Sequence, residues 1–166
     1  MKKIFISFII ITLFFKLNGQ NTDSLRIISF EKTYPSLNYN NLVLKYNKLE
    51  QIIDTIEFEY LYYLKYKNNE FSYFNMSSDE KLFQEKVGLK KHQEVAEIGT
   101  ELLQKDPTDL KTLLYTSISC KKINQLDIAD ELQKRFELLI HIISKYGDGK
   151  TIETSYQIVK ISDEYA

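Results

Sequence analysis

The sequence predicts a mainly α-helical protein built from antiparallel helix hairpins, with a short β-segment near the carboxyl end. Between His92 and Ser144, apolar or small residues recur at helical spacing, and one set returns after 34 residues. The recurring positions are Val95, Ile98 and Leu102, and then Ala129, Leu132 and Phe136. Side chains alternate in character over residues 156–161, which is typical of a strand.

A shift of 34 residues is the period of the tetratricopeptide helix-turn-helix repeat, so about one and a half repeats are expected. Asp106-Pro107 separates the first two helices, because proline disfavours αR at the preceding residue and suits a helix start. Asn124-Gln125 is the next turn. The last helix is expected to cover residues 126–146, with Gly147 in the left-handed conformation that ends it.

The helical spacing also predicts which residues face inward. The second helix is expected to bury Leu110, Leu113, Leu114, Ser117, Ile118 and Lys121. The third is expected to bury Ala129, Leu132, Phe136, Leu139, Ile140 and Ile143. Cys120 is predicted to be a buried small residue, and as the single cysteine it excludes an intrachain disulfide.

Residues 1–19 are predicted to be a secretory signal. Lys2 and Lys3 precede an uncharged apolar run over residues 4–15, and a polar segment follows. That run makes about 18 Å of helix, too short for a hydrocarbon core of about 30 Å. We therefore expect cleavage after Gly19, no stable membrane anchor afterwards, a periplasmic or secreted location, and a single helical domain over residues 20–166.

The charge of the remaining chain argues against nucleic acid as a partner. Loss of three lysines with the signal leaves 19 basic against 23 acidic residues, a net charge of −4. Nucleic acid requires a basic face. No cofactor is predicted, and His92 and His141 have no acid or cysteine at metal-ligand spacing.

Four short helices are expected before the hairpins. One follows Asp23-Ser24 and closes at Tyr34-Pro35, and another starts at Asn40 or Asn41 and runs through about residue 48. Asp54 and Glu57 have the spacing of a capping box. The residues after them fit both a strand and a helix, and we favour the helix because it leads into a polar break. Ser77 and Glu80 form a second capping box, whose helix ends at Gly88.

Eight aromatic residues crowd into residues 58–74. One interpretation is a stacking surface for glycans or peptides, because tyrosine has a flat apolar face and a polar end. The favoured interpretation is that they fill the core between helices. The residues of the possible binding surface are Tyr60, Tyr62, Tyr63, Tyr66, Asp148 and Glu153.

The carboxyl end carries a turn and a strand. Residues 147–150 are expected to form a tight turn. The strand at residues 156–161 lacks an evident partner, so we expect it to be the least stable part of the molecule, with Val159 and Ile161 partly exposed.

The segment 147–154, with the strand and residues 161–165 after it, resembles the domain-of-unknown-function family numbered 4919, exported proteins found mainly in Bacteroidota. Residues 59–63 and the break at residues 105–107 are also similar, and the resemblance covers roughly residue 39 to the end. Leu64 and Ser155 depart from the usual glycine and alanine. The family usually continues further, so truncation is the first explanation for the unpaired strand. The alternatives are pairing with a loop such as residues 71–74 and edge-to-edge pairing of two chains. The resemblance implies an exported helical fold and no activity.

Two functions are compatible with these features. The favoured one is a helical-repeat module that binds a protein or peptide partner, because stacked helix pairs build a concave surface. The alternative is a carboxylate-dependent hydrolase or glycan-binding protein that uses the tyrosines with Asp148, Glu153, Asp163 or Glu164. Acid and base carboxylates must lie about 5 to 9.5 Å apart, and nothing in the sequence brings two of these together. We therefore expect a protein that is not an enzyme.

Overall fold

The computed structural model describes residues 30–49, 51–67, 71–72, 75–151, 154–161 and 163. The chain divides into two units, Met1–Ser36 and Leu37–Ala166. In the first unit, residues 30–33 are helical and the Tyr34 amide donates to the Phe30 carbonyl, which is the end of the short helix expected before Pro35. The predicted signal lies outside the described residues.

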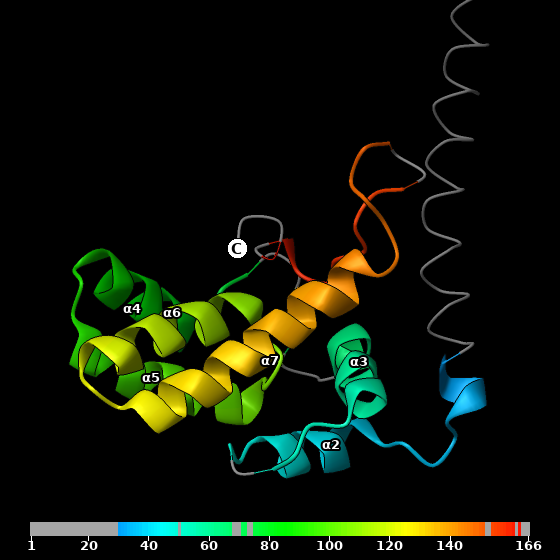
Figure 1. Ribbon diagram of the computed structural model, residues 1–166, viewed down its shortest axis with the longest axis horizontal. Helices are drawn as coiled ribbons and strands as arrows, with labels where there is room; N and C mark the ends of the chain where they lie inside the picture. The colour runs from blue at the N-terminus through cyan, green and yellow to red at the C-terminus, as the bar shows by residue number, and fades with distance from the viewer. Residues whose placement is uncertain are drawn as a thin grey trace, which may run out of the picture. The chain divides into compact units, whose positions relative to one another are not determined.

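The regular structure described in the second unit is helical (Figure 1). Its elements are α2 (Tyr39–Tyr46), α3 (Thr55–Tyr63), the short 3-10 helix η1 (Lys65–Lys67), α4 (Ser78–Gly88), α5 (His92–Lys105), α6 (Leu110–Lys122) and α7 (Leu126–Ser144). None of the helices in the described ranges is both long and apolar enough to span a membrane.

Helices α4 to α7 pack in chain order: α5 contacts both α4 and α6, and α7 contacts α6. The turns between them are short, and Lys90 and Asn124 adopt positive φ angles of 55° and 63° in these turns. Phe83, Val95 and Leu102 form a core cluster between α4 and α5. The three helices expected between His92 and Ser144 are therefore confirmed.

The caps at the helix starts are set by the sequence. Ser77 and Glu80 form the expected capping box of α4. Asp54 caps α3 by accepting from the amides of Ile56 and Glu57. Glu57 does not complete a second capping box, because its carboxylate accepts from the Tyr46 hydroxyl and from Lys45 instead.

Helix α3 is buried on almost every side, and this burial explains its ambiguous pattern. All residues from Phe58 to Tyr63 are buried. A helix that is apolar all round lacks the stripe that distinguishes a surface helix from a strand. The expected helix is confirmed, and its aromatic side chains lie in the core.

The inward faces of α6 and α7 differ from the expected ones. Cys120 is buried as expected, but α6 also buries Thr116 and Ser119, and the expected inward residues Ile118 and Lys121 are exposed. The reason is that α6 packs between α5 and α7, so more than one stripe is covered.

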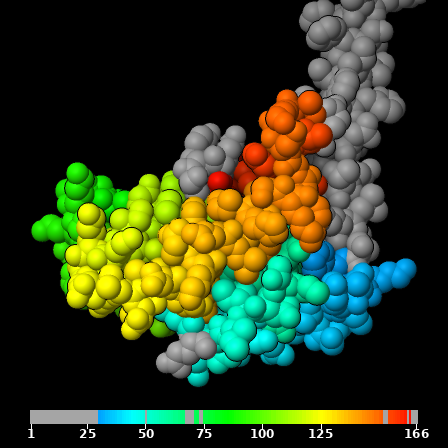
Figure 2. Space-filling view, viewed as in Figure 1, coloured from blue at the N-terminus to red at the C-terminus, as the bar shows by residue number. Residues whose placement is uncertain are grey.

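In α7, Ile140 is exposed, whereas Arg135 and Ile142 are buried. This helix contacts α3 as well as α6, which widens its buried face. Arg135 donates from Nη1 to the Tyr46 carbonyl at 2.6 Å and from Nη2 to the Lys48 carbonyl at 2.9 Å. The outer side of α7 forms a ridge across one face of the molecule (Figure 2).

Gly147 does not end α7 as expected. The helix stops at Ser144, and Gly149, with φ 67°, is the glycine in the left-handed region. Gly147 is required by close approach, since a Cβ there would lie 2.5 Å from the carbonyl oxygens of Thr154 and Ser155. The amides of Asp148 and Gly149 both donate to the Thr154 carbonyl, so the chain closes on residue 154 and not within the tight turn expected at residues 147–150.

The prediction of a strand at residues 156–161 is wrong. The described residues contain no strand, and this segment has an irregular backbone. The Val159 amide donates to the Tyr62 hydroxyl at 3.2 Å, so a side chain of α3 takes the place of a partner strand. Val159 is half-buried and Ile161 is exposed.

Candidate binding groove

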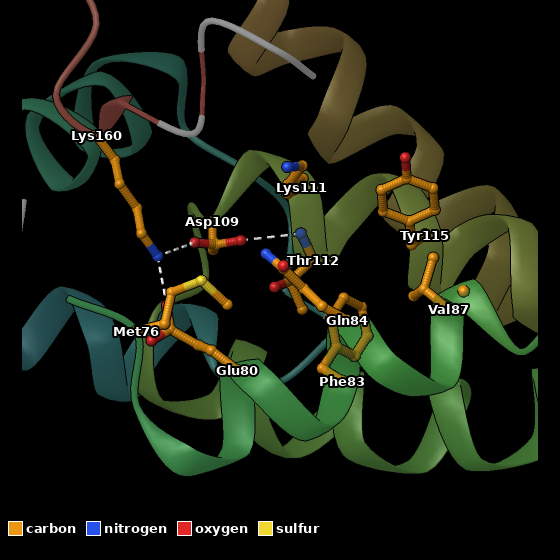
Figure 3. Close-up of a pocket in the computed structure, with 11 residues that line it drawn as sticks. Met76, Glu80, Phe83, Gln84, Val87, Asp109, Lys111, Thr112, Tyr115 and Lys160 are labelled. Carbon is orange, nitrogen blue, oxygen red and sulfur yellow. Dashed lines mark hydrogen bonds and ion pairs between the residues drawn. The ribbon is translucent and has the colours of Figure 1, made fainter. Parts of the chain in front are cut away.

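A cavity of about 230 Å³ lies between α4 and α6, and we call it the α4–α6 groove (Figure 3). Its apolar end is lined by Phe83 and Val87 of α4 and by Tyr115 of α6. Phe83 belongs to the core cluster, and the other two side chains pack against that cluster while remaining half-buried. The floor of the groove is therefore fixed by the core of the protein.

The other end of the groove is charged. Lys160 extends from the carboxyl-terminal segment, and its ammonium lies 2.5 Å from Glu80 Oε1 and 2.9 Å from Asp109 Oδ2 (Figure 3). The three side chains are largely buried, with 14%, 24% and 10% exposure for Lys160, Glu80 and Asp109. We call Glu80, Asp109 and Lys160 the acid–lysine cluster.

Both carboxylates are fixed at the starts of helices. Glu80 Oε2 accepts from the Ser77 amide at 2.7 Å within the capping box of α4. Asp109 is the N-cap of α6 and accepts from the Thr112 amide at 2.9 Å. Local capping chemistry thus holds one oxygen of each carboxylate and leaves the other for Lys160.

The charges of this cluster stabilise one another. Burial alone would raise the pKa of Asp109, but Lys160, Lys65 and the hydrogen bond from Thr112 lower it to about 2. Burial alone would lower the pKa of Lys160, but Asp109 and Glu80 raise it above its ordinary value. At neutral pH, Asp109 and Lys160 are therefore both charged.

A second cavity of about 320 Å³ adjoins the groove. It is lined by Tyr39, Phe71, Leu102 and Lys105 among others. The two cavities share Met76, Thr112 and the whole acid–lysine cluster. Lys160 therefore contributes to the walls of both cavities.

A second buried lysine supports the loop between α5 and α6. Lys65 is 1% exposed and donates to Asp106 Oδ2 at 3.1 Å and to the Thr108 carbonyl at 3.0 Å. Its ammonium also lies 4.9 Å from the centre of the Tyr62 ring. Lys65 thus holds the loop that places Asp109.

Asp163 joins the carboxyl-terminal segment to the same region. The Tyr62 hydroxyl donates to Asp163 Oδ2 at 2.9 Å, and Oδ1 has no hydrogen-bond partner among the described residues. Burial raises the pKa of the Asp163 carboxyl, and the nearby Lys65 opposes this effect.

The predicted site residues lie mostly elsewhere. Tyr60, Tyr62 and Tyr63 are buried and Tyr66 is half-buried, so three of the four tyrosines belong to the core and offer no binding surface. None of these tyrosines lines either cavity. The structure brings Tyr62 together with Asp163, one of the carboxylates considered for the alternative function.

The predicted carboxylates Asp148 and Glu153 come from the segment after α7. Asp148 is exposed and accepts from the Thr154 hydroxyl at 2.6 Å, and it pairs with Lys150 at 3.1 Å. Glu153 lies outside the described residues. The interactions described here for Asp148 are therefore made within its own part of the chain.

The acid–lysine cluster was missed as a site by sequence reasoning. Glu80 is recognisable as a capping residue, and Asp109 precedes a helix in the same manner, but neither pattern indicates a shared cation. Lys160 was assigned to a strand. Its pairing with residues 80 and 109 depends on a fold that brings three distant segments together.

The fold and the groove define a small, mainly helical protein with a charged cavity between two helices. The chain belongs to the family Domain of unknown function (DUF4919), whose model matches residues 29–166. The family resemblance is therefore confirmed. No curated protein and no solved structure matches the chain. Within the described residues, no group of three or more His, Cys, Asp or Glu residues is placed to hold a metal ion.

Proposed function

We propose that this protein is a tetratricopeptide-like module that binds a peptide segment of a partner protein in the α4–α6 groove. The observation that carries the proposal is the composition of the groove. An apolar floor of Phe83, Val87 and Tyr115 leads to a fixed charged end at Glu80 and Asp109. Such a site can take an apolar side chain and a polar neighbour of the same peptide.

The size of the cavities favours side chains over a whole small molecule. Pockets for small molecules measure about 300–1,000 Å³ and enclose most of their ligand. The α4–α6 groove, at about 230 Å³, is below this range, and the adjoining cavity, at about 320 Å³, is at its lower end. A peptide that lies along the helices and inserts single side chains suits this size better than a cofactor.

The arrangement of helices supports the repeat interpretation. The groove lies between α4 and α6, and both of these helices pack on α5. In helical repeats, alternate helices line one concave surface. Among the positions that recur after 34 residues, Val95 and Ala129 are both buried. The buried Leu102 corresponds to the half-buried Phe136.

We also propose that the protein is exported and acts in the periplasm or outside the cell. The support is the order of charge and apolar residues in residues 1–19. Amino-terminal sequencing of the protein recovered outside the cytoplasm should find a chain that begins near Gln20. Recovery with Met1 intact would contradict the signal.

Peptide binding is tested by selection from a displayed library of random peptides, followed by titration of the selected peptides. Gln84→Arg places a long charged side chain on the groove wall from an exposed position, and we expect affinity to fall about tenfold or more, which corresponds to about 1.4 kcal/mol. Gln93→Arg is the matched control, because Gln93 is exposed on α5 and does not line the groove.

Two results would contradict the proposed function. One is a selection that yields no peptide with saturable binding. The other is binding that responds equally to Gln84→Arg and Gln93→Arg, because the peptide would then lie outside the α4–α6 groove.

A further inference from the structure

The lysine in the groove comes from a segment that is not part of the helical stack. Residues 155–161 have an irregular backbone. Apart from the contacts of Lys160, two hydrogen bonds to α3 are described for this segment. The Val159 amide donates to the Tyr62 hydroxyl at 3.2 Å, and the Tyr63 hydroxyl donates to the Gln157 carbonyl at 3.5 Å. Both of these contacts are made by tyrosine side chains of α3, and neither involves a residue of α4 to α7.

Withdrawal of Lys160 alone would be unfavourable. Glu80 and Asp109 would remain as two largely buried carboxylates without their shared cation. An unpaired buried charge is strongly destabilising. Another cation must therefore take the place of the Lys160 ammonium whenever the segment leaves.

The position of Lys160 also determines how much of the groove is accessible. Its side chain lines both cavities, and their shared residues lie around its ammonium. Without Lys160, the two cavities would meet at the carboxylates. The connected space would have an acidic centre with an apolar wall at Phe83 and Val87 on one side and at Phe71 and Leu102 on the other.

We propose that Lys160 occupies, within its own chain, the subsite that receives a lysine or arginine side chain of the bound peptide. The carboxyl-terminal segment is then an internal competitor, and the ligand is a peptide with a basic residue next to apolar ones. This inference rests on the peptide-binding function proposed above. It adds the chemical class of the ligand and the contact that regulates access.

A tethered competitor has a predictable strength. A short flexible connection gives an effective concentration in the millimolar range, so a separate peptide at micromolar concentration competes poorly. Removal of the Lys160 ammonium should therefore increase the affinity for a basic peptide by about tenfold or more. Lys160→Arg keeps a cation in the subsite and should bind as weakly as the wild type.

The probe for this experiment is an amidated peptide with the sequence of residues 155–161, labelled with fluorescein at its amino terminus, because this segment is the one seen to place a lysine in the site. A second peptide carries glutamine in place of the lysine. The proteins are the wild type, Lys160→Met and the control Lys150→Met. Lys150 is 79% exposed, lies in the same part of the chain and pairs with Asp148.

We expect Lys160→Met to bind the lysine peptide about tenfold or more tightly than the wild type does, and to bind the glutamine peptide as weakly as the wild type does. Lys150→Met should behave as the wild type. Two results would overturn the inference. One is that Lys160→Met and the wild type bind the lysine peptide with equal affinity. The other is that Lys160→Met binds the two peptides with equal affinity.

A second measurement does not depend on the folding of a variant. Hydrogen exchange of the wild type, saturated with a peptide selected from the random library, should be faster at the Val159 amide than in the free protein. If exchange at the Val159 amide is unchanged while Gln84→Arg still weakens binding, the carboxyl-terminal segment is not an internal competitor. The proposed peptide binding in the groove would then still hold. Loss of all peptide binding would contradict the proposed function itself.

Discussion

Gly99 lies where α5 packs closely against Thr116 of α6 and Phe83 of α4. A Cβ at this position would lie 1.9 Å from Thr116 Oγ1 and 2.9 Å from the Phe83 ring. Gly99→Ala should therefore lower the free energy of unfolding by about 1–3 kcal/mol through overpacking. Gly88→Ala is the matched control, because no atom lies within 4 Å of its Cβ position, and it should leave stability equal or raise it by about 0.5–1 kcal/mol.

Denaturant unfolding of both glycine variants checks this contact. If Gly99→Ala were as stable as Gly88→Ala, α5 and α6 would not pack as closely as described.

Arg135 fixes the chain after α2. Arg135→Met keeps an apolar stem of similar length but removes the donors to the Tyr46 and Lys48 carbonyls. Unsatisfied buried acceptors cost about 1–3 kcal/mol, so the free energy of unfolding should fall by that amount. Lys134→Met changes the neighbouring side chain, which is 71% exposed, and should change stability by less than about 0.5 kcal/mol. Equal midpoints in thermal unfolding would mean that the two hydrogen bonds contribute nothing.

At the scale of single elements, the attachment of residues 156–161 depends on α3. Tyr62→Phe removes the hydroxyl that accepts from the Val159 amide and donates to Asp163. We expect faster hydrogen exchange in residues 157–161, while exchange in α5 to α7 stays nearly unchanged, because regions with few contacts open locally. Tyr60→Phe is the control, since its hydroxyl donates to the Leu37 carbonyl. Residues 157–161 that exchange at the same rate in both variants would rule out Tyr62 as the anchor.

Most helices could be predicted because their ends carry local signals. The sequence alone reveals these signals, because each acts on a helix end within a few residues of itself. They are Ser77 with Glu80, Asp54, and Asp106-Pro107. Buried faces were harder, because they depend on neighbours. The burial of Arg135 follows from the approach of the chain after α2, which helical periodicity does not contain.

The strand at residues 156–161 was predicted from alternation, but alternation says nothing about whether a partner strand exists. The structure supplies the Tyr62 hydroxyl instead. The aromatic residues of α3 are compatible with a binding surface in the sequence, because a fully buried helix and a binding patch can have the same composition. Location in the core could be favoured from sequence but not established by it.

At the scale of the whole molecule, the acid–lysine cluster makes stability depend on pH. The pKa of Asp109 is lowered from 3.8 to about 2. A lowered pKa in the folded protein contributes stability above the ordinary pKa, and this contribution is lost as the pH falls through the folded value. The free energy of unfolding should therefore decrease between pH of about 4 and 2.

Asp109→Asn isolates that contribution. The variant should be less stable than the wild type at pH 6, and the difference should shrink as the pH falls from about 4 to 2. Denaturant unfolding across this range measures it. A difference that stayed constant with pH would mean that Lys160, Lys65 and Thr112 do not stabilise the Asp109 carboxylate as described.

The candidate site could not be predicted from sequence, because Glu80, Asp109 and Lys160 come from three separate segments. Taken alone in the sequence, each residue is interpreted as a helix cap or as a surface charge. Only the packing of α4 beside α6, with the carboxyl-terminal segment at their starts, makes them one cluster with two adjoining cavities.

The most direct test of the central claim is a map of amide chemical shifts during titration with a selected peptide. Peptide binding in the α4–α6 groove predicts the largest changes at Gln84, Val87, Thr112 and Tyr115, with smaller changes along the outer face of α7. Shifts confined to α7, for example at Ile128 and Lys134, or the absence of shifts at saturating peptide, would contradict it.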